Sequence, residues 1–353
     1  MPTPSGTTLG LTVAQDLINT TLIAYERADV IWQTIADKPL LKALKSKQKT
    51  FPNGQQTISI AVQGTKMSDT PGFLQGYQND DELVFNQSDN VLRATVPWKE
   101  VHAGLIITFT ELKIDGISVD QSKTFSQHSK SELNQLLQLA KNRKDDFNES
   151  WAVAMNQMLW QDGSQDGKQV PGIQSIITDN PTSGTTCGLS RTTYPWWRHI
   201  AAVGANRIVA SKQNQTLSQY IRDLKIQLLM FGGKPDTMLA GSGALSNLQR
   251  EVSEKGVYTQ TGFSKGVNFS IGTLSIAGIG DVQYDPTMDL IGWSKRILIF
   301  DSRRIKLMPM AGEENRTLMP ERPYNYMVWM MSKTWTGGLT CSQLNANAII
   351  ETA

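Results

Sequence analysis

The fold of this chain turns on one stretch, "SKSELNQLLQLAKNRKDDFNESWAVAMNQMLW", residues 129–160. Its apolar side chains recur at the three-and-four spacing of one helix face: Leu133, Leu136, Leu137, Ala140, Phe147, Trp151, Ala154, Met155, Met158 and Leu159. Ser129 and Glu132 have the spacing of an N-terminal capping box. At 1.5 Å per residue such a helix is roughly 45–50 Å long, more than a compact domain needs. The stretch therefore predicts a long spine helix.

A second stretch, "QVPGIQSIITDNP" at residues 169–181, follows the spine. Pro171-Gly172 ends the helical pattern, and Asp179-Asn180-Pro181 is typical of a turn. We interpret the apolar run between them as a short strand. Such a bounded strand indicates an active-site loop, a linker, or a boundary between two subdomains, and these alternatives imply different functions.

On the N-terminal side of the spine, the pattern changes to a period of two. Ile58, Ile60 and Val62 alternate with polar residues, and residues 91–98 and 104–110 are also rich in β-formers. Between them, residues 66–90 are crowded with turn formers and carry a cluster of candidate contact residues: Lys66, Asp69, Asp80, Asp81 and Glu82. A hairpin this long with little apolar content cannot bury much surface on its own subunit, so we expect it to rest on a partner.

The N-terminal region predicts an amphipathic helix over residues 12–36. A basic run follows it, formed by Lys42, Lys45, Lys47 and Lys49. These lysines form either a solvated face or a patch that meets an acidic neighbour.

Beyond residue 181 the sequence contains both the helical periodicity and the strand periodicity of two. Residues 216–231 predict an amphipathic helix, residues 234–243 a strand that leads into a further helix, and residues 303–353 a return to strands. Helices and strands are neither strictly alternating nor segregated, which favours an α+β fold.

Composition narrows the function classes. The chain has 353 residues, 39% of them hydrophobic, and a formal net charge of +2, so it lacks the electrostatic character of a dedicated nucleic-acid binder. Any contact with DNA is expected to be weak or local. No segment approaches the ~20 apolar residues of a membrane span, and the N-terminus does not resemble a signal peptide. We therefore expect the protein to be made and folded in a cytoplasm.

No catalytic, cofactor-binding or metal-binding constellation is predicted. His102, His128 and His199 are far apart, and the two cysteines, Cys187 and Cys341, are too few for a disulfide framework or a cysteine-rich zinc site. The segment "TTYPWWRH", residues 192–199, is either an aromatic-cationic surface for stacking on bases or a packing wedge. No basic groove accompanies it in the local sequence, which favours packing.

The order of these elements resembles the major capsid proteins of tailed bacteriophages, which share the HK ninety-seven fold. Local similarity is carried by Gly172–Ile177, by "PDTMLAGSGALSNL" (235–248), by "IAGIGDVQYDPTMD" (276–289) and by "MVWMMSKTWTGGLTCSQLNANAII" (327–350). The resemblance implies five parts: an N-terminal arm (1–50), an extended β-hairpin loop (51–112), a peripheral domain with the spine helix (113–168), a compact axial domain (169–300), and return strands of the peripheral domain (301–353). It also makes the segment after the spine the transition into the axial domain.

The resemblance implies a structural protein and no enzyme. Copies of the chain would assemble through hexamers and pentamers into an icosahedral virion shell around double-stranded DNA, in the cytoplasm of a host bacterium. A portal protein, a separate scaffolding protein and a decoration protein are the further partners that it suggests. Some members of the family crosslink a lysine of the extended loop to an asparagine; Lys66 and Asn345 or Asn347 lie in suitable regions, but no surrounding motif identifies them, and no crosslink is assigned. Two alternatives remain: an encapsulin-type compartment with cargo enzymes, and a soluble enzyme with an unrecognised site.

Overall fold

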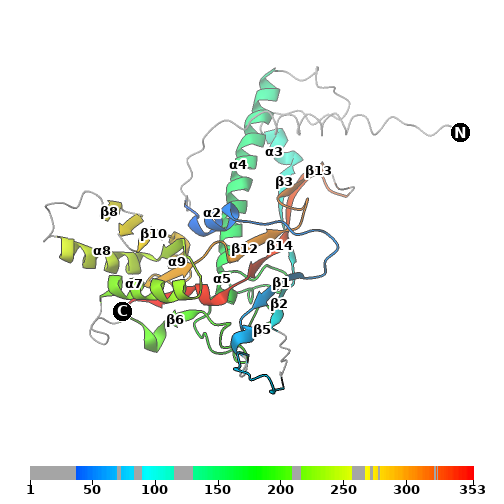
Figure 1. Cartoon of the computed structure of the whole chain (residues 1–353). Helices are drawn as coiled ribbons and strands as arrows, with labels where there is room; N and C mark the ends of the chain where they lie inside the picture. The colour runs from blue at the N-terminus through cyan, green and yellow to red at the C-terminus, as the bar shows by residue number, and fades with distance from the viewer. Residues whose placement is uncertain are drawn as a thin grey trace. The chain divides into compact units, whose positions relative to one another are not determined.

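The computed structural model describes residues 37–69, 73–82, 90–114, 130–208, 216–256, 267–270, 273–276, 279–321, 323 and 325–353. The predicted helix at 12–36, His128 and the capping residue Ser129 lie outside this part of the chain. Two compact units are present, and each is described by itself (Figure 1). The described residues of the smaller unit lie within 100–155 and 311–336, and those of the larger unit lie within 37–99, 156–310 and 337–353.

The smaller unit combines helix and sheet. Its elements are β3 (Lys99–Thr108), α3 (Phe109–Ile114), most of α4 (Lys130–Trp160), β13 (Arg316–Glu321) and the first part of β14 (Val328–Cys341). Strands β3 and β13 each pair with β14. One core cluster joins α3, α4, β14 and β3, and its buried residues are Phe109, Leu112, Ala140, Phe147, Trp329 and Met331. The guanidinium of Arg143 on α4 pairs with the Glu111 carboxylate at 2.6 Å.

The spine helix is confirmed as α4, which has 31 residues and is therefore about 46 Å long. Phe147, Trp151 and Met155 are buried as predicted, but Ala154 is exposed. Toward the end of α4 the buried residues include Asn156 and Trp160. Near the end of α4 the buried face is therefore the one that carries Asn156 and Trp160, and Ala154 lies on the exposed face.

We expect Phe147→Ala to lower the free energy of unfolding by about 3 kcal/mol, because it leaves a cavity in the core cluster of the smaller unit. Chemical denaturation of the unassembled subunit measures this loss. Ser150→Ala, at an exposed position of the same helix, is the control and should stay within about 0.5 kcal/mol of the wild type. A loss below about 1 kcal/mol for Phe147→Ala would show that the stripe contributes little to the core.

The larger unit is built on a seven-stranded sheet. Its strands, in spatial order, are β6 (Ile200–Ala202), β15 (Ala348–Glu351), β11 (Arg296–Phe300), β7 (Thr237–Ala240), β10 (Gly280–Tyr284), β9 (Thr273–Ile276) and β8 (Val267–Ser270). The β6–β15 and β7–β10 pairs are parallel, and the other pairs are antiparallel. Alternate residues of the strands share one core cluster with α7 (Leu217–Met230) and α8 (Ser242–Gly256), which lie side by side (Figure 1).

Both helices confirm the sequence pattern. Helix α7 begins after Thr216, which forms a capping box with Gln219, and α8 begins directly after β7. The inward face of α7 consists of Leu217, Ile221, Leu224 and Leu228.

The predicted strand after the spine is wrong: residues Ile173–Ile176 form α5, a single helical turn. Gly172 precedes this turn in an extended conformation, and a Cβ there would lie 2.2 Å from the Leu159 carbonyl oxygen. The helical turn brings Ile173, Ile176 and Ile177 to one buried side, whereas a strand would direct neighbouring residues to opposite faces. Their spacing of three and four is compatible with a helical turn, but so short a run does not define a period.

A buried polar network surrounds the end of α4. The Asn156 side chain accepts a hydrogen bond from the Leu41 amide (3.3 Å) and donates one to the Thr287 hydroxyl (2.8 Å). The Trp160 indole donates to the Asp285 carboxylate at 3.2 Å, and this carboxylate caps α9 (Pro286–Leu290). Because burial outweighs these hydrogen bonds, the pKa of Asp285 is raised. These contacts tie α4 and α9 to α2 (Pro39–Ser46), a helix that the sequence analysis did not predict.

The C-terminal part of the chain contributes to both units. Residues 311–336 belong to the smaller unit and residues 337–353 to the larger one. Strand β15 pairs there with β11 and β6, and β12 (Ile305–Pro309) pairs with Gly337–Cys341 of β14. The closing segment of the chain therefore completes the seven-stranded sheet.

Candidate assembly surfaces

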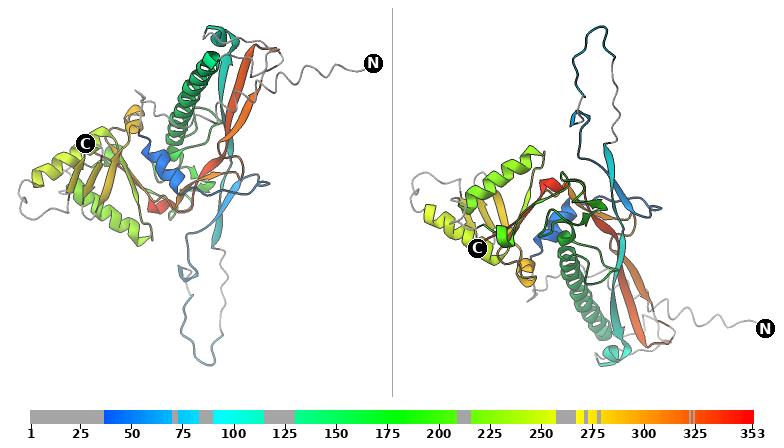
Figure 2. Two further views of the ribbon diagram at one scale, coloured as in Figure 1. Left: turned by 90° about the horizontal axis from the view of Figure 1, so that it is seen from above. Right: turned by 90° about the horizontal axis from the view of Figure 1, so that it is seen from below.

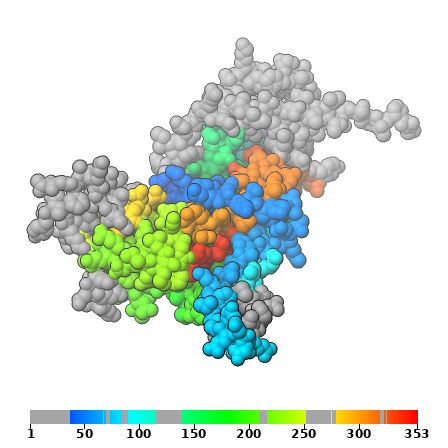
Figure 3. Space-filling view, in the orientation of Figure 1, coloured from blue at the N-terminus to red at the C-terminus, as the bar shows by residue number. Residues whose placement is uncertain are grey.

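The predicted hairpin is present as an antiparallel pair of β1 (Ile58–Gln63) and β2 (Val91–Val96). The expected third strand begins earlier than predicted, as β3 at Lys99, and residues 109 and 110 already belong to α3. Figure 2 shows residues 73–82, which belong to the connection between β1 and β2, far from the seven-stranded sheet of the same unit. Every described residue of its outer segment, 73–82, is exposed, and the segment forms the projecting cyan surface in Figure 3.

All five candidate contact residues of this loop are exposed: Lys66, Asp69, Asp80, Asp81 and Glu82. Two of them also shape the backbone. The Asp69 carboxylate accepts a hydrogen bond from the Lys66 amide, and the Asp81 carboxylate accepts one from the Gln78 amide, both at 2.8 Å. Asp69 and Asp81 each form a local turn in this way, and both residues remain exposed to solvent.

The loop also carries apolar side chains that the sequence analysis undervalued. Phe73 and Tyr77 are more than half exposed, and Leu74 is 92% exposed. The signal was visible as "PGFLQGY", residues 71–77, but it was interpreted only as turn sequence. Large apolar groups held in solvent on a projecting loop indicate a binding surface.

The basic run lies on and just after α2. Leu40, Leu41 and Leu44 form its buried face, and all four predicted lysines are exposed: Lys42, Lys45, Lys47 and Lys49. Among the described residues, no ion pair joins these lysines to the acidic residues of the loop.

The "TTYPWWRH" segment supports the base of the loop. Trp197 is buried and its indole donates to the Thr186 carbonyl at 3.1 Å, which matches the packing interpretation. The neighbouring Trp196 ring stands edge-on to it, with ring centroids 5.8 Å apart. Trp196 covers Gly64, where an added Cβ would lie 1.8 Å from the ring. Only glycine fits beneath this ring, at the residue that follows β1.

We expect Gly64→Ala to displace the Trp196 ring and to lower the free energy of unfolding by about 1–3 kcal/mol through overpacking. Tryptophan fluorescence and urea unfolding measure the two effects. Gly76→Ala is the matched control, because a Cβ there meets no atom within 4 Å. Equal behaviour of the two variants would contradict the packing of Trp196 on Gly64.

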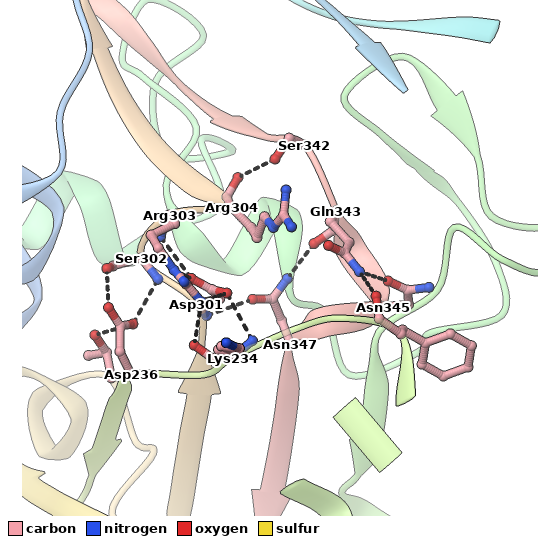
Figure 4. Close-up of polar contacts among 12 residues, drawn as sticks. Lys234, Asp236, Asp301, Ser302, Arg303, Arg304, Ser342, Gln343, Asn345 and Asn347 are labelled. Atoms are coloured by element: carbon pink, nitrogen blue, oxygen red, sulfur yellow. Dashed lines mark hydrogen bonds and ion pairs between the residues drawn. The ribbon is translucent and has the colours of Figure 1, made fainter. Parts of the chain in front are cut away.

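A buried carboxylate, Asp301, holds together three segments of the larger unit (Figure 4). Its oxygens accept hydrogen bonds from the Lys234 amide (3.1 Å), the Arg303 amide (2.9 Å) and the Arg303 guanidinium (3.0 and 2.8 Å). Its own amide donates to the Asn347 side chain at 3.2 Å. Burial alone would raise the pKa of Asp301, but the hydrogen bonds and charge of Arg303, with the Lys234 amide, outweigh burial and lower it.

The same network bears on the two asparagines considered for a crosslink. Asn347 is fully buried, and its side-chain nitrogen Nδ2 donates to the backbone carbonyls of Gln343 (2.9 Å) and Leu344 (3.1 Å). The Asn345 side chain accepts a hydrogen bond from Gln343 at 3.0 Å (Figure 4). Asn347 therefore serves the packing of this turn.

Burial sets the protonation state of the titratable groups considered for chemistry. Burial lowers the pKa of His199 to about 4, and its ring contacts the Thr178 carbonyl at 2.6 Å. Burial raises the pKa of Cys187 to about 11 and also raises that of Cys341, so both thiols are protonated at neutral pH. Within the described ranges, no group of three histidine, cysteine or acidic side chains is placed to hold a metal ion. Nor does any described helix have the apolar length needed to cross a membrane.

Comparison with known proteins identifies solved structures with a similar fold. No protein-family model and no curated protein sequence matches the chain. Among solved structures, the capsid of cyanophage A-1(L) is 13% identical and has a TM-score of 0.60, over 94% of this chain and 97% of that chain. The capsid of a native GTA particle is 12% identical with a TM-score of 0.53, over 93% and 94% of the two chains. The capsid of Myoviridae phage XM1 is 12% identical with a TM-score of 0.51, over 94% and 98%. The chain therefore has the α+β fold of tailed-phage capsid proteins, the HK ninety-seven fold.

Proposed function

We propose that this chain is the major capsid protein of a tailed bacteriophage, and that its role is structural. One observation carries the proposal: the fold similarity to the cyanophage A-1(L) capsid extends over 94% of this chain and 97% of that one. A shared fold alone does not define a function, but this similarity extends over nearly all of both chains and is not confined to one domain.

The described residues support an assembly role in a second way. A projecting loop with exposed apolar and acidic side chains has little value to an isolated subunit, since ordering it costs about 1–2 kcal/mol per residue. Contact with neighbouring copies offsets that cost. We propose that copies of the chain form hexamers and pentamers, which close into an icosahedral shell.

The proposal extends to the parts and partners of the shell. We assign residues 1–50 to an N-terminal arm, 51–112 to an extended loop, and 113–168 to a peripheral domain; 169–300 form an axial domain, and 301–353 supply the return strands. The shell encloses double-stranded DNA, which the nearly neutral chain contacts weakly and without sequence specificity. Assembly takes place in the host cytoplasm with a scaffolding protein and a portal protein, and a decoration protein can bind the finished virion.

Electron microscopy and sedimentation of the expressed chain test this function. We expect closed particles of uniform size, either from the chain alone or with a co-expressed scaffolding protein. A species that stays monomeric under both conditions contradicts the proposal. Particles that enclose a protein cargo and no DNA would instead indicate an encapsulin-type compartment.

We expect the double substitution Asp80→Lys and Asp81→Lys to slow assembly and to reduce its dependence on salt, because exposed charges mainly steer encounter. Light scattering at low and high salt follows the rate. Asp37→Lys with Asp146→Lys is the control, since it changes the net charge equally at exposed positions outside the loop. Unchanged kinetics at both salt concentrations would remove the loop's acidic residues from the interface.

A further inference from the structure

The two cysteines of the chain are distant in the sequence but neighbours within the larger unit. Cys187 is partly buried, and Cys341, near the end of β14, is fully buried. A hydrogen bond joins the Cys341 backbone to the Cys187 thiol, and the two thiols also interact electrostatically. Because the chain has no third cysteine, each thiol has one possible thiol partner within its own copy.

The pairing of β14 with β12 leaves the Cys341 amide free for this contact. The Ser342 amide donates to the Arg304 carbonyl at 2.9 Å, so these two residues form a hydrogen-bonded pair. In an antiparallel sheet such pairs alternate with pairs that exchange no hydrogen bond, and the next pair is Cys341 with Ile305. The Cys341 amide therefore points away from β12. It donates to the Cys187 sulfur on the other side of β14, since this hydrogen bond favours the thiolate of Cys187.

A tight turn presents Cys187 to β14. Strands β4 (Thr185–Thr186) and β5 (Leu189–Ser190) form a hairpin, and its two-residue loop is Cys187-Gly188, with φ of 49° and 78°. Asn-Gly is the preferred pair in such a loop, because few other side chains tolerate a left-handed backbone. Strand β5 lies against β2 (Figure 1), and the Thr95 amide of β2 donates to the Cys187 carbonyl at 2.8 Å. The turn is thus held from outside, and turn geometry alone does not favour a cysteine at this position.

We propose that Cys187 and Cys341 form a disulfide bond within one copy when the protein passes from a reducing to an oxidising environment. The bond fixes the β4–β5 hairpin to the end of β14. With the hairpin it fixes the Thr186 carbonyl, which accepts the Trp197 hydrogen bond at the base of the projecting loop. The inference is independent of the proposed function, because it concerns a single folded copy.

The oxidant is a small disulfide such as oxidised glutathione. The Cys187 thiolate attacks one of its sulfurs, since Cys341 is inaccessible to solvent, and one small thiol leaves. The Cys341 thiolate then attacks the Cys187 sulfur of the mixed disulfide and releases the second small thiol. Two protein thiols are oxidised, one small disulfide is reduced, and the two protein protons pass to the released thiols. Because burial keeps both cysteines protonated, the exchange is slow at neutral pH.

Oxidation of the unassembled full-length chain tests the bond. The native protein is incubated with oxidised or with reduced glutathione, then unfolded and alkylated. We expect both cysteines to be alkylated in the reduced sample and neither in the oxidised sample. A non-reducing digest of the oxidised sample should contain the peptide of Cys187 joined to that of Cys341. The oxidised form should melt about 5 °C higher, because the bond closes a long loop of the unfolded chain.

Cys187→Asn and Cys341→Ala are the matched variants. Asparagine suits the left-handed turn position, so Cys187→Asn should fold as well as the wild type. Cys341→Ala leaves a small cavity, and the comparison of oxidised with reduced samples of the same variant cancels its effect. We expect the melting temperature of either variant to be the same in both glutathione samples.

Three results in the wild type would overturn the inference: two alkylated cysteines after oxidation, a mixed disulfide on Cys187 that persists, or a disulfide that forms only between copies. Each of them leaves the capsid function intact. Conversely, a chain that forms no particles but oxidises as expected would overturn the capsid function and leave the disulfide in place.

Discussion

Replacement of residues 66–90 with a short Gly-Ser turn is expected to leave a folded subunit that forms no closed particles. The β1–β2 pair ends at Gln63 and Val91, and Gly64 beneath Trp196 is retained, so the replacement removes exposed side chains and one half-buried side chain, Asn90, among the described residues. Circular dichroism and the free energy of unfolding should therefore stay close to those of the wild type. Every subunit of the shell would use this loop against a neighbour, so its removal repeats the same defect around the whole shell.

Sedimentation and negative-stain microscopy measure both halves of this expectation on one sample. A Gly-Ser segment of the original length is the matched control, and it should fail in the same way, because the side chains of the loop and not its length supply the binding surface. Normal shells from either variant would remove the loop from the assembly mechanism. An unfolded subunit would show that the loop belongs to the core.

Asp301→Asn is expected to lower the free energy of unfolding by about 3 kcal/mol at neutral pH. The substitution keeps the size of the side chain but directs an amide group at donors. The amides of Lys234 and Arg303 and the Arg303 guanidinium all point at this position, so part of the network loses its acceptors. Because Arg303 is half exposed, its own charge remains partly solvated, which limits the loss.

The pH dependence of this effect has a definite sign. The folded pKa of Asp301 is lowered, so the carboxylate stabilises the fold above its unfolded pKa of about 3.9 and loses that contribution as pH falls through the folded value. The difference between wild type and Asp301→Asn should therefore be constant above about pH 5 and shrink below about pH 4. Urea unfolding at several pH values measures it.

Glu313→Gln is the matched control for Asp301→Asn. Glu313 pairs with Arg316 at 2.8 Å, the same distance as in the Asp301–Arg303 pair. In the Glu313–Arg316 pair, however, both side chains are substantially exposed. An exposed pair contributes at most about 1 kcal/mol. Equal losses in the two variants would contradict the assigned role of Asp301.

Elements with a strong local period were predictable. Helices α4, α7 and α8 have apolar spacings that only one helix face satisfies, and β1 alternates with a period of two. The exposure of the loop at 73–82 was predictable for a related reason, since its polar residues leave no side to bury. The sequence of this loop also contains Phe73, Leu74 and Tyr77. Because turn residues surround them, the segment was interpreted only as a turn and not as an apolar binding surface.

Short or non-periodic elements were not predictable in this way. The four residues of α5 are too few to define a period, and Pro171 and Asp179 at its borders are compatible with either a strand or a helical turn. Helix α2 was not predicted, because its lysines were interpreted only as part of a basic run. The partners of Asp301, at positions 234, 303 and 347, are distant in the sequence, and none belongs to a motif.

The sequence by itself determined the long spine helix, the projecting acidic loop and the α+β order of elements, because each depends on residues that lie within a few turns or one hairpin of one another. Tertiary structure alone decided that β15 completes the seven-stranded sheet, that Trp196 covers Gly64, and that α7 keeps a second apolar face exposed. Those outcomes depend on pairing and packing between distant segments. The entropy cost of bringing such distant segments together is offset only when the complete core forms, so no local sequence pattern predicts these contacts.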